Sequence, residues 1–230
     1  MTPIPLARVI RFPHARRSAA LAAILLSAAV GCSDNSPESS ATASNPPGKT
    51  ASSRAAPSID LKKPVVRLET GAGKITLQLD GVRAPGTVRN FLNYAGDGFY
   101  DNTLVHYVDP GNMIVAGGYT ADRAPKAARP PIRNEAHNEL KNVRGTIAMA
   151  RDQSLIDSAT SQFFINLADA PQRDHRGDQA GEYGYCVFGH VIDGLEVADA
   201  ISRSATANAG VDLAQTPQPP VVIKSVRVVR

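Results

Sequence analysis

The side chains that could carry acid–base or metal chemistry are few and lie far apart along the chain. Five histidines occur without the close spacing of a local metal motif, and no cysteine or carboxylate spacing completes one. Three acidic residues, Glu135, Glu139 and Asp152, lack the spacing of a paired general acid and base. We therefore predict no metal and no cofactor. The histidines are His14, His106, His137, His175 and His190.

Two further features invite a chemical interpretation. Cys186 could act as a nucleophile beside a histidine, but its apolar neighbours favour a small buried hydrophobe inside a strand. The segment Gly71-Ala72-Gly73-Lys74 matches a phosphate-binding loop only in part, because Ile75 stands where such a loop needs Ser or Thr. A hairpin turn is the favoured interpretation of that segment.

The elements that must position these side chains are mostly short β-prone runs. Residues 65–70 and 74–80 flank the Gly-Ala-Gly turn, and apolar and polar residues alternate in the second run. From Thr87 the apolar spacing becomes i, i+3, i+4, i+7 and ends at Gly96, which predicts an amphipathic helix. A second helix is predicted at residues 195–201. The remaining predicted strands are residues 103–108, 113–116, 146–149, 163–166, 185–191 and 221–229. This pattern predicts a mainly β fold, a closed antiparallel barrel with helices over its ends.

Composition limits the classes of protein that remain. The chain has 230 residues, with 43% hydrophobic and 20% charged residues, which is typical of one globular domain with extensions. Lys and Arg number 25 against 21 Asp and Glu, but four of the basic residues precede Cys32, where there is no acidic one. The rest of the chain is neutral, which argues against a nucleic-acid partner.

The N-terminal segment predicts export and membrane attachment. Residues 1–31 have the form of a signal peptide: basic residues up to Arg17, an apolar run at 19–30, then small residues. The sequence Ala29-Val30-Gly31-Cys32 resembles a bacterial lipobox, so Cys32 is the predicted lipidation site, with ordinary signal-peptidase cleavage as the alternative. Residues 33–58 hold eight Ser, five Ala and four Pro and cannot form a core. We interpret residues 32–63 as a disordered tether and residues 64–230 as the folded domain.

Two blocks of the folded domain match a known family closely, residues 144–151 (RGTIAMAR) and residues 158–166 (SATSQFFIN). They resemble the cyclophilins, the family of peptidyl-prolyl cis-trans isomerases, and in particular its bacterial extracytoplasmic members. Shorter matches follow in the family's order at residues 90–91, 98–100, 131–135 and 187–189. The resemblance implies an eight-stranded antiparallel barrel capped by two helices, and catalysis of X-Pro isomerisation without a covalent intermediate.

The implied catalytic groove departs from the family pattern. The segment that runs Phe-His-Arg in the family reads Val105-His106-Tyr107 here, so the hydrogen-bond donor would be a phenol without charge. Asn112 replaces a pocket Phe and Val115 a substrate-binding Gln. Gln172 and Arg173 stand where an aromatic residue and a Leu are usual. The substrate-binding positions that match the family pattern, or a variant that bacterial relatives tolerate, are Met113, Ala150, Gln162, Phe164 and Tyr185.

Each of these residues also has a structural interpretation. Met113 and Phe164 could belong to the core, and Gln162 could be a solvated strand residue. His106 is interpreted as structural, because the reaction needs no proton transfer. Arg151 and Arg173 could bring a cation into the groove in place of the missing Arg, or remain solvated surface charges.

Two functions of different classes are therefore open. The first is an impaired prolyl isomerase that acts on proline-containing segments of secreted or envelope proteins, held at a bacterial membrane by its lipid anchor and facing the periplasm. The second is a non-catalytic cyclophilin-like module that binds a peptide or protein. A monomer is expected in either case.

Overall fold

The computed structural model describes residues 60–210 and 213–229. The predicted signal peptide, Cys32 and nearly all of the predicted tether lie outside the described residues. In this part of the chain, none of the helices has the length and apolar character that crossing a membrane requires.

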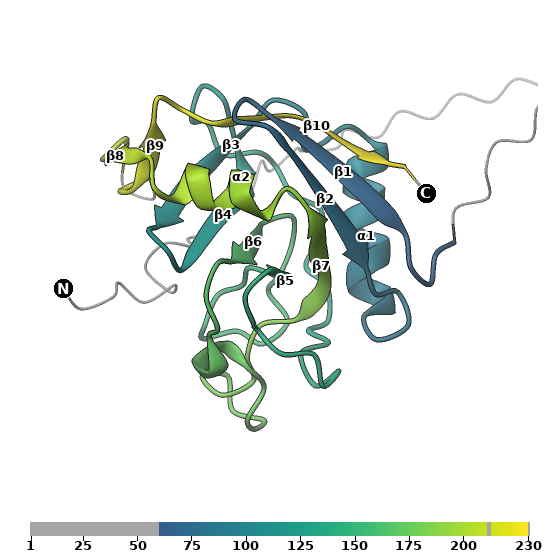
Figure 1. Cartoon of the computed structure of the whole chain (residues 1–230). Helices are drawn as coiled ribbons and strands as arrows, with labels where there is room; N and C mark the ends of the chain where they lie inside the picture. The colour runs from purple at the N-terminus through teal and green to yellow at the C-terminus, as the bar shows by residue number, and fades with distance from the viewer. Residues whose placement is uncertain (1–59, 211–212, 230) are drawn as a thin grey trace, which may run out of the picture. The chain divides into compact units, whose positions relative to one another are not determined.

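Eight antiparallel strands close into a barrel in the order β1-β10-β3-β4-β6-β5-β7-β2 (Figure 1). This confirms the predicted fold class. The barrel places β4 and β6 next to each other although about 50 residues separate them in sequence, and it brings the chain end back to β1. The bounds are β1 Val65–Thr70, β2 Lys74–Leu79, β3 Thr103–Asp109, β4 Met113–Thr120, β5 Thr146–Met149, β6 Phe163–Asn166, β7 Val187–Asp193 and β10 Val222–Val228.

Two α-helices accompany the barrel. Helix α1, Pro85–Gly96, starts two residues before the predicted Thr87, with Pro85 in the first turn, where its missing N–H is not needed. The Glu135 carboxylate accepts hydrogen bonds from the N–H groups of Gly86 (3.0 Å) and Thr87 (2.8 Å) and so caps this helix from a distant segment. Helix α2 runs Leu195–Ser202, close to its predicted range.

Three short elements were not predicted from the sequence. A two-stranded sheet joins β8, Ala205–Ala207, to β9, Thr216–Gln218, and a 3₁₀ helix, η2, covers Pro171–Arg173. Strand β4 is four residues longer than predicted, and its last residue, Thr120, pairs with Thr103 of β3. Strand β7 begins at Val187, so Cys186 directly precedes the strand and does not lie inside it.

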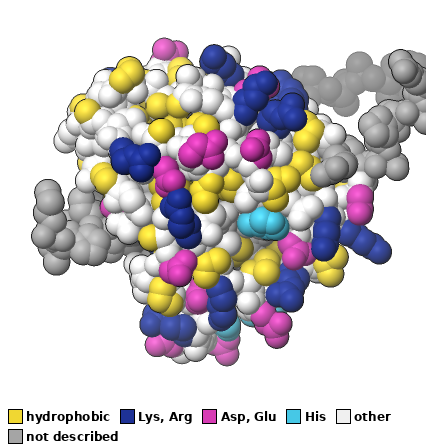
Figure 2. Space-filling model, in the orientation of Figure 1, with side chains coloured by type: hydrophobic (Ala, Val, Ile, Leu, Met, Phe, Trp, Pro, Cys, Tyr) yellow, Lys and Arg dark blue, Asp and Glu magenta, His cyan; other side chains and the backbone are white. Residues whose placement is uncertain are grey.

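The barrel interior holds a cluster of aromatic rings in tilted and edge-to-face contact. Phe91 of α1 lies 5.1 Å from Tyr100, 5.5 Å from Phe163 and 5.3 Å from Phe188, measured between ring centroids. These rings and the inward-facing aliphatic side chains form the interior cluster. On the face of the molecule drawn in Figure 2, basic and acidic side chains are intermixed around the apolar ones, as expected for a neutral domain.

Candidate functional site

One row of cross-strand neighbours forms the outer face of the barrel at the predicted groove. Tyr107 of β3 pairs with Val115 of β4, Val115 with Phe164 of β6, Phe164 with Ala148 of β5, and Ala148 with Val187 of β7. Because residues directly opposite each other point to the same side of a sheet, this row is continuous over five strands. The row and its neighbours form the outer cluster: Tyr107, Met113, Val115, Ala148, Ala150, Phe164, Tyr185 and Val187, with Leu140 packed against them.

A β-bulge in β3 turns Tyr107 toward this face. Val105 pairs with Ala116 and Tyr107 with Val115, so two steps along β3 match one step along β4, and His106 is the extra residue. Val105 therefore packs in the interior cluster and Tyr107 in the outer cluster. Without the bulge the two side chains would point to the same side.

The apolar surface of the outer cluster is already covered by the protein itself. Phe164, Val115, Ala148 and Ala150 are 0% exposed, and Met113 is 1% exposed. The ring of Tyr185 packs edge-on against Phe164 at 5.6 Å. A proline-binding pocket needs an accessible apolar wall, so this face is closed in the structure.

Arg173 is the side chain that closes the face from the η2 side. Its guanidinium carbon lies 5.5 Å from the centre of the Phe164 ring, and the residue is only 8% exposed. Its Nη1 donates a 2.7 Å hydrogen bond to Asn166 Oδ1, at the end of β6. Burial lowers the pKa of Arg173, and the charges of Asp109, Tyr185 and Tyr107 oppose that shift. An arginine nevertheless stays protonated, so a cation lies over the Phe164 ring.

Asn166 was not identified from the sequence as a site residue. Its Nδ2 donates to Thr146 Oγ1 at 2.9 Å and to Asn142 Oδ1 at 3.2 Å, while its Oδ1 accepts from Arg173. Asn142 in turn donates to the carbonyl of Arg173 at 3.1 Å. This network fixes η2 against the barrel. Its members belong to separate loops and strands, so no local spacing indicates it.

Tyr107, the residue that the sequence resemblance aligns with the family's donor, lies in the outer cluster. Burial, with a smaller contribution from the charge of Asp109, raises its pKa to about 12, and Arg173 opposes the shift. The phenol is therefore neutral at physiological pH and can donate one uncharged hydrogen bond. It is only 2% exposed, so a substrate would reach it only after the outer cluster opens.

Arg151, the other arginine considered for the groove, has a structural role. Its Nε donates to the carbonyl of Gly184 at 2.8 Å and its Nη2 to that of Ala180 at 2.7 Å, and the residue is 1% exposed. Its guanidinium carbon lies 5.1 Å from the centre of the Tyr185 ring. It is neither a solvated surface charge nor accessible to a substrate.

The remaining predicted site residues lie outside the outer cluster. Asn112 is exposed, and its Nδ2 donates to Asp109 Oδ1 at 3.1 Å, within the turn between β3 and β4. Gln172 is exposed on η2. Gln162 is buried against Gly118, where an added Cβ would meet its Cδ at 2.7 Å. It therefore belongs to the packed interior and is not a solvated strand residue.

His106 is fully buried beside the Tyr119 ring, at 4.8 Å between ring centroids. Burial lowers the pKa of His106 to about 4, although Leu104 and Gln162 oppose the shift. The imidazole is therefore neutral near pH 7 and structural, as the sequence interpretation favoured.

The other sequence motifs carry no catalytic geometry. Burial raises the pKa of Cys186 to about 12, which leaves a protonated thiol instead of a nucleophilic thiolate. The segment at residues 71–74 contains the turn of the β1–β2 hairpin, in which Thr70 N donates to Gly73 O at 2.8 Å. Among the described residues, no three His, Cys, Asp or Glu side chains gather as a metal site.

Known proteins resemble the whole folded domain. The family model described as cyclophilin type peptidyl-prolyl cis-trans isomerase/CLD matches residues 65–228. The chain is 48% identical to peptidyl-prolyl cis-trans isomerase A of Dickeya dadantii, over 72% of this chain and 84% of that protein. It is 44% identical to peptidyl-prolyl cis-trans isomerase B of Escherichia coli, over 71% and 99%.

A solved structure supports the same assignment. The cyclophilin-type isomerase of Cryptosporidium parvum, crystallised in the presence of the dipeptide Ala-Pro, superposes with a TM-score of 0.61 at 25% identity. The superposition covers 72% of this chain and 99% of that one. The resemblance to the cyclophilin family is therefore confirmed, and this chain belongs to the cyclophilin-type peptidyl-prolyl cis-trans isomerases, a family of enzymes.

Proposed function

We propose that this chain is a prolyl isomerase of low turnover that assists the folding of extracytoplasmic proteins from a lipid anchor at Cys32. The observation that carries the low turnover is the closed outer face. Phe164, the ring on which a proline would pack, is 0% exposed and lies under the Arg173 guanidinium. The family membership supports the reaction itself.

The chemistry of the reaction explains why these residues limit it. Rotation about an X-Pro bond has a barrier of about 18–20 kcal/mol, because the twist breaks amide resonance. A catalyst holds the proline in an apolar pocket and donates a hydrogen bond that favours the twisted amide. With Tyr107 as a neutral donor, the expected loss resembles that of an oxyanion-hole donor, about 10² to 10³ in rate.

The substrate must also displace the closing side chains before it binds. Moving Arg173 away from Phe164 breaks its contact with Asn166 Oδ1 and exposes a buried aromatic ring. A charge-assisted hydrogen bond contributes about 1.5–3 kcal/mol, so opening the face lowers substrate affinity in addition to the catalytic loss. We therefore expect proline-containing segments of secreted or envelope proteins to bind weakly and to dissociate quickly.

The activity is tested by a proline-isomerisation assay on the purified full chain, with the Tyr107→Arg variant beside it. We expect slow but measurable catalysis that scales with enzyme concentration. Turnover as fast as that of a cyclophilin with the Phe-His-Arg motif, measured in the same assay, would contradict the proposed impairment.

The location is tested separately. The wild-type chain should fractionate with membranes, and the Cys32→Ser variant should accumulate as an uncleaved or soluble precursor. A fully soluble wild-type protein whose Cys32 is unmodified by mass spectrometry would contradict the lipid anchor.

The closed face also supports a second function, a non-catalytic module that binds a peptide or protein. In that case the full chain would show no isomerisation above the uncatalysed rate but would still bind a proline-containing peptide. The assay above, combined with a titration of that peptide, distinguishes the two functions.

A further inference from the structure

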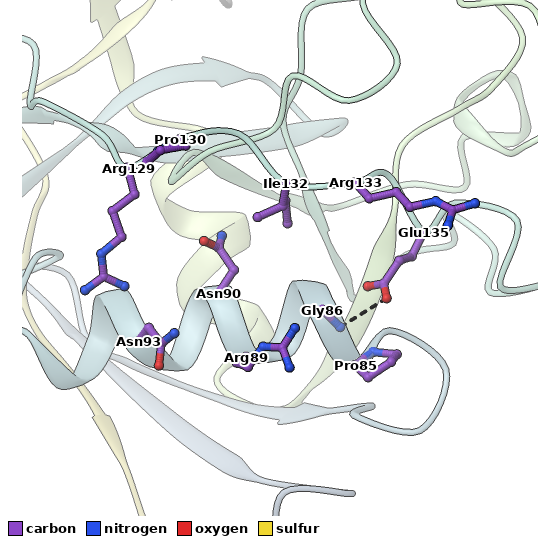
Figure 3. A pocket seen from close by; sticks show the side chains of 10 residues that line it. All are labelled: Pro85, Gly86, Arg89, Asn90, Asn93, Arg129, Pro130, Ile132, Arg133 and Glu135. Atoms are coloured by element: carbon purple, nitrogen blue, oxygen red, sulfur yellow. Dashed lines mark hydrogen bonds between the residues drawn. The ribbon is translucent and has the colours of Figure 1, made fainter.

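A hollow of about 530 Å³ lies between helix α1 and residues 129–135. Figure 3 shows it with the helix on one side and the extended segment from Arg129 to Glu135 on the other. It shares no residue with the outer cluster. Its volume is within the range of about 300–1,000 Å³ that is usual for ligand sites.

Two positive charges at this hollow have no partner. Arg89 projects from α1 and Arg133 from the facing segment, and both side chains are exposed (Figure 3). Neither makes a hydrogen bond or ion pair with any described residue. Arg129 differs, because it is paired with Asp97 and its guanidinium lies over the Tyr94 ring.

Glu135, the acidic side chain that lines the hollow, already has hydrogen-bond partners. Glu135 accepts hydrogen bonds from the N–H groups of Gly86 and Thr87 and from the Thr87 hydroxyl, at 2.7 to 3.0 Å. Its carboxylate therefore neutralises the helix N-terminus and is not free to pair with Arg89 or Arg133. The hollow consequently has an uncompensated positive charge.

The shape of the hollow and its apolar walls indicate which class of ligand it can bind. Pro85, Pro130 and Ile132 supply apolar surface, and the exposed Asn93 supplies an amide that can bond a peptide backbone. A flat membrane surface does not enter a concave site, and an isolated anion would leave the apolar walls uncovered. An extended chain with acidic side chains matches the charges, the walls and the depth together.

We propose that this hollow binds an acidic, extended peptide segment of a partner protein through Arg89 and Arg133. Each guanidinium can hold a carboxylate with two parallel hydrogen bonds, which sets the position of the segment on the helix. The site is separate from the groove that isomerises proline, so it would retain a client whether or not the client's proline is being turned over.

The test is fluorescence anisotropy of labelled decapeptides with the full chain at two ionic strengths. One peptide carries four glutamates and no proline, and its matched peptide carries four glutamines. The decisive variant is Arg89→Gln with Arg133→Gln. The control is Arg67→Gln with Arg203→Gln, which removes the same charge from exposed positions outside the hollow. Circular dichroism checks that both variants are folded.

We expect the glutamate peptide to bind at least about tenfold more tightly than the glutamine peptide, because its carboxylates can form charge-assisted hydrogen bonds with both guanidinium groups. The decisive variant should lose at least about tenfold in affinity and the control less than about twofold. Equal binding of the two peptides would overturn the proposal. So would equal losses in the two variants, since these indicate a general basic surface. Anionic vesicles are added as a competitor of the glutamate peptide. If the vesicles displace the peptide and the control variant abolishes that displacement, the peptide binds a general membrane-binding surface outside the hollow. This result would also overturn the proposal.

Discussion

The two faces of the same strands differ in what they pack against. On β6, Phe163 points inward and meets the rings of Phe91 and Tyr100 at 5.5 Å, whereas the next residue, Phe164, points outward under Arg173. The interior is packed with aliphatic and aromatic side chains, among them Tyr94 and Tyr100. The outer face also contains two tyrosines, but a cation, Arg173, lies over its central ring. The two sides of one sheet are therefore packed by different kinds of side chain in this protein.

The two buried arginines extend this comparison. Arg151 donates to several backbone carbonyls, so its position is set by the loops that it joins. Arg173 donates to one neutral side chain and otherwise rests on an aromatic ring. Because fewer hydrogen bonds hold it, Arg173 is the element of the outer face that a substrate or a substitution can move at lower cost.

The comparison is tested most directly by truncating the two neighbouring phenylalanines. Phe163→Ala should reduce the free energy of unfolding by about 3–5 kcal/mol, because the rigid interior cannot collapse into the cavity. Phe164→Ala should cost at least about 1 kcal/mol less, because Arg173 and Tyr185 can relax at the surface. Urea denaturation of both variants measures the difference. Equal losses would mean that the outer face is packed as rigidly as the interior.

The buried His106 at the β3 bulge should make the stability of the folded state depend on pH in the acid range. His106 has a folded-state pKa of about 4 against an ordinary value of 6.5. The unfolded chain therefore binds a proton first as the pH falls, so stability is full above about pH 6.5 and is lost between 6.5 and 4. The loss for this residue amounts to up to about 3 kcal/mol.

The measurement compares wild type with His106→Gln by denaturation at several pH values. Carboxylates titrate in both proteins, so only the difference between the two curves reports His106. A difference that stays constant from pH 6.5 to pH 4 would show that burial does not hold the imidazole neutral.

Rebuilding the outer face should restore catalysis only when several residues change together. Tyr107→Arg alone should raise kcat/KM by less than about tenfold, because Arg173 still covers Phe164 and the new cation would lie close to it. Adding Asn112→Phe, Val115→Gln and Arg173→Leu should bring the rise to about 100-fold, the usual contribution of one well-placed donor. A hundredfold rise from Tyr107→Arg alone would show that the pocket is already open.

The smallest expected effect concerns cyclosporin, an apolar cyclic peptide that the family resemblance implies would bind the same face. It would have to cover Arg173, Asn112 and Gln172 without giving them partners, at roughly 1–3 kcal/mol for each buried polar group. We expect affinity weakened by more than about tenfold and no submicromolar binding. Arg173→Leu should recover part of the affinity. Tight calorimetric binding to the wild type, with a large negative heat-capacity change, would mean that these side chains move aside readily.

Much of the barrel follows from local sequence pattern. The strands β1, β5 and β6 have the predicted bounds, and Phe163, Ile165 and Met149 point inward as alternating positions of short apolar runs do. The apolar stripe of helix α1 was also predicted from local spacing, although the helix starts at Pro85 and not at the predicted Thr87. These features depend on neighbours within a few residues, so the sequence alone determined them, and it also indicated the family that the comparisons confirm.

The state of the groove was decided only by the tertiary structure. The bulge at His106 depends on the pairing of β3 with β4, and the position of Arg173 depends on Asn142 and Asn166, which reach η2 from other elements. The hollow beside α1 likewise arises where residues 129–135 pass the helix. Strand register and the packing of one loop against another are set by partners tens of residues away. Local periodicity therefore locates these side chains on their strands and helices, but it does not determine which of them meet.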